Sequence, residues 1–103
     1  WLIGEAIFFY LPVGICWSAV KKMGGIAFKF VSPGNAGVPD RIVVLPGGKV
    51  VFTELKTASG RLSTLQQRQI ARIARAGGQV RVVYGMAGVE DFLEAAREMV
   101  ENG

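Results

Sequence analysis

Residues 39–56 have the sequence Pro-Asp-Arg-Ile-Val-Val-Leu-Pro-Gly-Gly-Lys-Val-Val-Phe-Thr-Glu-Leu-Lys. Two runs of mostly β-branched and apolar residues flank the turn-forming segment Pro46-Gly47-Gly48-Lys49. This pattern predicts a β-hairpin with strands over residues 40–45 and 50–56.

The length of the hairpin loop decides which residues lie opposite each other. A two-residue Gly47-Gly48 turn would place Arg41 opposite Glu54, and Asp40 would point away. A three-residue loop over residues 46–48 places Asp40 opposite Glu54 instead. We expect the longer loop, because Gly48 supplies the left-handed residue that its third position needs. A bulge nearer Asp40 would have the same effect.

The rest of the chain is predicted to add helices and strands on both sides of the hairpin. Ser63 and Gln66 form a capping box that opens a helix, and Gly77-Gly78 ends it. The other expected elements are a helix over residues 13–23, strands over 26–31 and 79–84, and a helix over 89–101. The order α-β-β-β-α-β-α predicts one α+β domain over residues 1–103, with a mixed β-sheet flanked by helices.

Each of the last two helices carries apolar residues at helical spacing, and we expect these residues to be buried. For the helix that opens at Ser63 they are Leu65, Ile70, Ile73 and Ala74. For the last helix they are Val89, Phe92, Leu93, Ala96, Met99 and Val100.

The charges are unevenly distributed along the chain. Asp40 and Glu54 are the two acidic residues between Glu5 and Glu90, a stretch that holds eleven Lys and Arg residues. The net charge of +4 suits a polyanionic partner. There is no histidine and one cysteine, Cys16, which excludes His-ligated zinc, His-based acid–base catalysis and an internal disulfide.

Two carboxylates held across a strand pair repel each other, and a hard divalent cation turns that repulsion into a binding site. Asp40 and Glu54, with the Leu55 backbone carbonyl as a third ligand, therefore predict a Mg²⁺ or Mn²⁺ site. Lys56 shares a strand face with Glu54 and can stabilise a phosphate in its transition state. Gln66 can reach the same place. The alternative is a solvated Glu54–Lys56 ion pair of little consequence.

The first residues are unusually apolar. Residues 1–19 contain a single charged residue, Glu5. The length of this apolar segment allows a membrane span, but Glu5 and Pro12 oppose one. A buried segment or a dimer surface is the expected interpretation, and no membrane partner is expected.

Residues 37–56 followed by Gly-Arg-Leu-Ser-Thr-Leu-Gln at 60–66 resemble the VRR-NUC (virus-type replication-repair nuclease) family of the PD-(D/E)xK nuclease superfamily. The resemblance extends from about Val20 to Phe92. It implies a restriction-endonuclease-like αβββαβ core with an extra C-terminal helix. It also implies Mg²⁺- or Mn²⁺-dependent cleavage of DNA, by a homodimer that acts on branched DNA such as four-way (Holliday) junctions.

The resemblance also assigns residues. Asp40 and Glu54 match the family's metal ligands, Lys56 its catalytic lysine and Gln66 its motif glutamine. The family's first-helix glutamate has no counterpart at Val13-Gly14-Ile15, and Glu5 is the N-terminal carboxylate that could replace it. Expected DNA contacts are Lys29, Ser32, Asn35, Arg41, Arg61, Arg68 and Arg72, although an arginine stripe on a helix is also a common solvated surface.

The expected function is therefore a structure-specific DNA endonuclease without an organic cofactor, located in the cytoplasm of a bacterium or of a phage-infected bacterium. A non-catalytic DNA-binding or assembly module with a degenerate site is the main alternative. A membrane-tethered fragment of a larger enzyme is a third.

Overall fold

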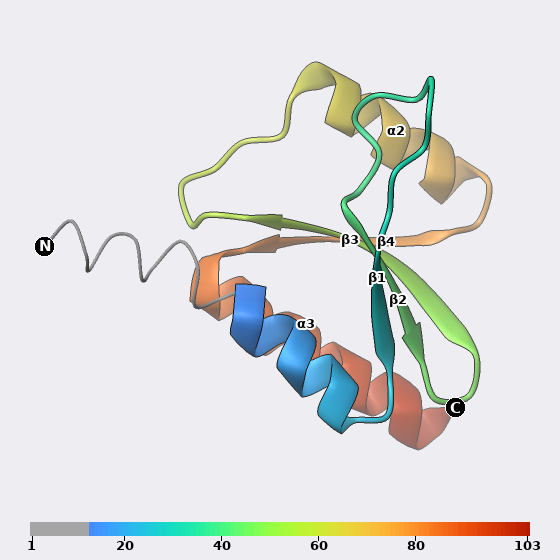
Figure 1. The fold of residues 1–103 in the computed structure, drawn as a ribbon, viewed down its shortest axis with the longest axis vertical. Coiled ribbons are helices and arrows are strands. Elements are labelled where there is room, and N and C mark those ends of the chain that lie inside the picture. The colour runs from blue at the N-terminus through green and yellow to red at the C-terminus, as the bar shows by residue number, and fades with distance from the viewer. Residues whose placement is uncertain (1–12) are drawn as a thin grey trace, which may run out of the picture.

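The computed structural model describes residues 13–103, and it contains one four-stranded sheet with helices on both faces (Figure 1). A helix covers residues 13–22. The remaining elements are β1 (Ile26–Lys29), β2 (Arg41–Leu45), β3 (Lys49–Lys56), α2 (Thr64–Arg75), β4 (Gln79–Tyr84) and α3 (Gly85–Asn102). The predicted α+β fold and its element order are confirmed.

The sheet has the strand order β1-β2-β3-β4. β1 pairs with β2 and β2 with β3 in antiparallel fashion, whereas β3 and β4 are parallel. The connection between the parallel strands contains α2, as a parallel crossover requires. The sheet is therefore mixed, as predicted.

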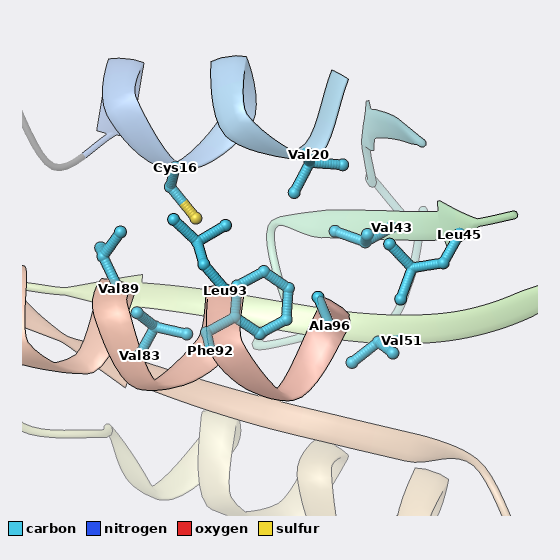
Figure 2. Close-up of a cluster of buried hydrophobic side chains, with 10 residues drawn as sticks. All are labelled: Cys16, Val20, Val43, Leu45, Val51, Val83, Val89, Phe92, Leu93 and Ala96. Carbon is cyan, nitrogen blue, oxygen red and sulfur yellow. The ribbon is translucent and has the colours of Figure 1, made fainter. Parts of the chain in front are cut away.

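The main core lies between the sheet and two helices, the one over residues 13–22 and α3 (Figure 2). Cys16 and Val20 approach from the first helix, and the strands supply four further apolar side chains. The α3 residues in this core are Val89, Phe92, Leu93 and Ala96, with Met99 and Val100 packed at its border. The buried face predicted for the last helix is thus confirmed.

α2 covers the opposite face of the sheet, together with the loop that joins β1 to β2 (Figure 1). This layer is less apolar than predicted. Leu65 is 47% exposed and Ala74 is also exposed, so these two predictions were wrong. The buried residue of α2 is Gln69, at 8% exposure. The helix is rotated so that the Gln66 and Gln69 side chains point inward, and the predicted residues Ile70 and Ile73 are half-buried.

Several boundaries differ from the sequence predictions. β1 ends at Lys29 rather than at residue 31, β2 begins at Arg41, and β3 begins at Lys49. α3 begins at Gly85 instead of Val89. Gly85 has a positive φ of 61°, and a Cβ at this position would lie 2.9 Å from the Ala58 side chain. Glycine thus lets β4 continue directly into α3.

Within residues 13–103, no helix is both long enough and apolar enough to cross a membrane. The prediction for the apolar residues before Val13, including their role as a dimer surface, concerns residues outside the described part.

Candidate active site

The hairpin register brings Asp40 and Glu54 to opposite positions. Leu45 pairs with Lys49, and Arg41 pairs with Thr53, so the next position places Asp40 across from Glu54. The loop has three residues and includes Gly48 with φ of 84°. The Gly48 N–H donates to the Leu45 carbonyl over 3.0 Å. The predicted loop length is therefore confirmed.

Glu54 is a buried carboxylate, with 7% of its surface exposed. Burial raises its pKa above the ordinary value, and the neighbouring Asp40 carboxylate raises it further. The Lys56 ammonium and the Asp40 backbone N–H oppose the shift in this pKa. The two carboxylates are thus close enough to interact electrostatically.

Asp40 is exposed as a residue, yet the surrounding protein removes enough water from its carboxyl group to raise the pKa. The backbone N–H groups of Asp40 and Leu55 oppose this shift, as do Arg41 and Lys56. Both carboxylates therefore lie where added positive charge would be stabilising.

Lys56 stands on the same face of β3 as Glu54. Its Nζ lies 3.9 Å from Glu54 Oε2, and the two side chains are 21% and 10% exposed. This separation is at the outer limit of an ion pair and too long for a direct hydrogen bond. Because the pair is partly shielded from water, its electrostatic influence is stronger than that of a surface pair.

Gln66 joins the helix cap to the candidate site. Its Oε1 accepts from the Ser63 N–H (2.9 Å), and the Ser63 Oγ accepts from the Gln66 N–H (3.1 Å), which completes the predicted capping box. Its Nε2 donates to Glu54 Oε2 over 3.3 Å. One side chain therefore caps the start of α2 and orients the Glu54 carboxylate.

The Leu55 carbonyl faces the gap beyond the start of β2. The Asp40 carbonyl accepts from the Phe30 N–H (2.8 Å), so this carbonyl faces β1, and the backbone groups of the next residue, Arg41, face β3. Along β3, the backbone N–H and C=O groups of successive residues point alternately toward and away from β2. Those of Leu55 therefore point toward Pro39. Proline has no N–H. Within residues 13–103, the Leu55 carbonyl consequently lacks a hydrogen-bond donor from the β2 side of the ladder.

The loop over residues 32–39 is held tightly against α2, a feature that the sequence predictions missed. Gly37 has φ of 92°, and a Cβ there would lie 2.6 Å from the Leu65 carbonyl carbon. The Gln69 Nε2 donates to the Ala36 carbonyl over 3.3 Å. The one sequence signal for this contact was an amide three residues after Gln66, on the same side of the helix.

The oxygen donors that are present fit a hard divalent cation. No group of three His, Cys, Asp or Glu residues that could hold a metal was found within residues 13–103, so the protein donors are two carboxylates and a carbonyl. Burial raises the pKa of Cys16 to about 12, with Asp40 as a further cause, which keeps this thiol protonated and unsuited to metal binding. Glu5 lies outside the described residues.

The residues predicted to contact DNA are divided between the two faces of the sheet. Ser32, Asn35 and Arg72 lie on the α2 side and line one groove. Arg68 is exposed on α2, and Arg61 is exposed in the preceding loop.

Lys29 and Arg41 are paired across β1 and β2. By strand alternation they lie on the face of the first helix, where the Arg41 guanidinium stacks 5.4 Å from the Trp17 ring centroid. These two side chains therefore do not share the face of Glu54 and Lys56.

Comparisons with known proteins agree with this arrangement. Residues 17–87 match the family model of the VRR-NUC domain. A protein of Acyrthosiphon pisum secondary endosymbiont phage 1, named "Putative nuclease p44", is 52% identical over 66 residues, which are 64% of this chain and 71% of the phage protein. A solved structure described as a VRR_NUC domain matches with a TM-score of 0.76 and 27% identity, over 81% of this chain and 90% of that chain. The family match covers most of the chain and includes the hairpin and α2, and the chain therefore belongs to the VRR-NUC family of nuclease domains.

Proposed function

We propose that this nuclease domain is a Mg²⁺- or Mn²⁺-dependent DNA endonuclease that acts on branched DNA. The observation that supports it best is the convergence of Asp40, Glu54 and Lys56 at one end of the sheet, on the face that also carries the basic helix α2. Two carboxylates with raised pKa values favour a cation, and the arginines of α2 favour a phosphate backbone.

Asp40, Glu54 and the Leu55 carbonyl would hold the metal ion. When bound, the ion supplies a water of lowered pKa and neutralises charge on the scissile phosphate. Lys56 places a compact positive charge beside Glu54, where it stabilises the negative charge that develops on the phosphate. Gln66 holds the Glu54 carboxylate in one orientation through the 3.3 Å hydrogen bond and so reduces the reorganisation that ligand binding requires.

The preference for four-way junctions, the homodimer and the location in the cytoplasm of a phage-infected bacterium form part of the proposal. The matched phage protein supports the location. A two-fold symmetric dimer would place two sites on two strands of one branched substrate. Analytical ultracentrifugation tests the dimer, and a protein that stays monomeric at micromolar concentration contradicts this part alone.

A cleavage assay on a labelled four-way junction in Mn²⁺ tests the activity. Alanine at Asp40, Glu54 or Lys56 is expected to lower cleavage by at least about a hundredfold, as loss of a transition-state contact does, with junction binding retained. Glu90→Ala is the matched control, because Glu90 is an exposed carboxylate on α3, away from the site. A Glu54→Ala protein that cuts as fast as the control would refute the proposal.

A second candidate is a non-catalytic DNA-binding module. It is favoured by one observation: Val13-Gly14-Ile15, where the family has a glutamate, carries no acid. Isothermal titration with Mn²⁺ separates the two candidates, since an endonuclease must bind the ion at a site that Glu54→Ala removes. DNA binding without such a Mn²⁺ site supports the non-catalytic module.

A further inference from the structure

An open groove of about 310 Å³ lies beside the candidate active site. Its walls are the loop over residues 32–39 and α2, and its floor is the face of the sheet between them. The residues that matter most for its chemistry are Phe30, Ser32, Asn35, Phe52, Gln69 and Arg72. The two aromatic side chains take no part in the proposed cleavage reaction.

The groove adjoins the catalytic groups along two elements. Phe52 precedes Glu54 by two residues on the same face of β3, a separation of about 7 Å. Gln69 follows Gln66 by three residues on α2 and is its neighbour on the helix surface. Arg72 is in turn a neighbour of Gln69, and both line the groove. A nucleic acid strand whose phosphate lies at Glu54 would thus have a neighbouring nucleotide over the groove.

The floor of the groove is aromatic. The rings of Phe30 and Phe52 lie 5.7 Å apart between centroids, with an angle of 60° between their planes. Both side chains are only partly buried, which leaves part of their surface available to a planar ligand. Aromatic surfaces of this kind stack with nucleobases of any sequence.

The rim of the groove is polar and held in place. Asn35 Nδ2 donates to Ser32 Oγ (2.9 Å), and Arg72 donates to Gln69 Oε1 (3.1 Å). Gln69 in turn donates to the Ala36 carbonyl. These contacts do not use the side-chain oxygen of Asn35 or the other N–H groups of Arg72. The former can accept from a base edge, and the latter can donate to a phosphate.

We propose that this groove binds one unpaired nucleobase of the DNA strand that is cut, next to the scissile phosphate. The inference rests on the proposed function, and it narrows the substrate class to DNA with an unpaired or extruded nucleotide at the cleavage site. A base inside a duplex cannot reach an aromatic floor without leaving its stack. The positive charge of Arg72 suits a nucleotide better than an uncharged apolar ligand.

A fluorescence titration with two duplexes of one sequence tests the inference. One duplex is fully paired, and the other carries a single bulged 2-aminopurine. EDTA prevents cleavage. The unaltered protein is expected to bind the bulged duplex about fivefold or more tightly than the paired one, the low end of what stacking on one base provides, and to quench the 2-aminopurine emission.

Phe30→Leu and Phe52→Leu retain apolar volume but remove the aromatic faces. Each is expected to lower affinity for the bulged duplex by about fivefold and to leave affinity for the paired duplex within about twofold, the size of change expected when no contact is lost. Phe28→Leu is the matched control, because Phe28 belongs to β1, shares the face of Phe30 and is 59% exposed, but does not line the groove.

Equal affinity of the unaltered protein for both duplexes would overturn the inference, whether or not the variants fold. If that protein still cuts a junction in Mn²⁺, the proposed function stands without the base-binding groove. A protein that binds neither duplex would also overturn the inference, and junction cleavage in Mn²⁺ then decides separately whether the proposed function stands.

Discussion

Glu54 is a buried carboxylate whose charge is costly to the folded protein when no cation is present. Burial comes first among the causes that raise its pKa, and Asp40 comes second. The pKa of Glu54 is higher in the folded protein than in the unfolded chain. The free energy of unfolding therefore increases as pH falls through the folded-state pKa, and it stops increasing once pH is below the pKa of the unfolded chain. A divalent cation would bind this same negative charge. The charge on Glu54 therefore lowers the stability of the metal-free protein but raises its affinity for the metal.

Glu54→Gln is therefore expected to stabilise the metal-free protein. The introduced amide keeps an acceptor for the Gln66 side chain but carries no buried charge. In EDTA at pH 7.5 the melting temperature should rise by about 4 °C, the effect of about 1 kcal/mol in a domain of this size. Differential scanning calorimetry from pH 7.5 to pH 4 should show this difference shrinking as Glu54 is protonated in the unaltered protein.

Mn²⁺ provides the control at the residue scale. It is expected to raise the melting temperature of the unaltered protein and to have little effect on Glu54→Gln, since binding to the folded state alone stabilises it. A lower melting temperature for Glu54→Gln in EDTA at pH 7.5 would contradict the view that the charge is destabilising.

At the scale of elements, the position of α2 depends on the loop over residues 32–39. Gly37 fits against the α2 backbone, with a φ of 92° and no room for a Cβ. Gly34 in the same loop also has a left-handed φ, of 81°, but a Cβ there would meet nothing within 4 Å. Alanine substitutions at the two glycines therefore distinguish the free-energy cost of a left-handed backbone from the additional cost of a clash with α2.

Gly34→Ala is expected to cost about 1–2 kcal/mol from the left-handed conformation alone. Gly37→Ala should lower the melting temperature at least twice as much, because it adds a clash with the backbone of α2. It should also displace Gln66 from Glu54 and reduce junction cleavage at temperatures where the variant is still folded. Equal melting temperatures and cleavage rates for the two variants would show that the close contact is unimportant.

At the scale of the whole molecule, the two helices α2 and α3, which cover opposite faces of the sheet, carry opposite net charges. α2 carries Arg68, Arg72 and Arg75, whereas α3 carries five acidic residues and one arginine, Arg97. The two helices cover different faces (Figure 1). A DNA strand is therefore attracted to α2 and repelled by α3 itself, which favours an approach from the side of the candidate site.

Arg68→Gln should weaken DNA binding and reduce the slope of log affinity against log salt concentration by about 1, the value for one phosphate contact. Arg97→Gln removes the same charge from α3 and is the control. Fluorescence anisotropy at several salt concentrations measures both. The same slope for the two variants would mean that net charge, and not its location on α2, governs binding.

Local interactions explain what the sequence determined by itself. The Gly48 turn sets the register that aligns Asp40 with Glu54, and the Ser63–Gln66 capping box begins α2. Both depend on residues close together in the chain, as does the apolar spacing of α3. These features could be predicted because turn, cap and helix energetics involve few residues.

The tertiary structure decided how the elements meet. The contact of Gln66 with Glu54, the burial of Gln69 in place of Leu65, and the location of Arg41 beside Trp17 all join separate elements. Apolar spacing predicted burial of Leu65 and Ala74, which are exposed. The reason is that α2 turns Gln66 and Gln69 inward, toward Glu54 and the loop over residues 32–39. The free energy of such contacts depends on surfaces that exist only after the sheet has formed, and no local pattern in the sequence encodes them.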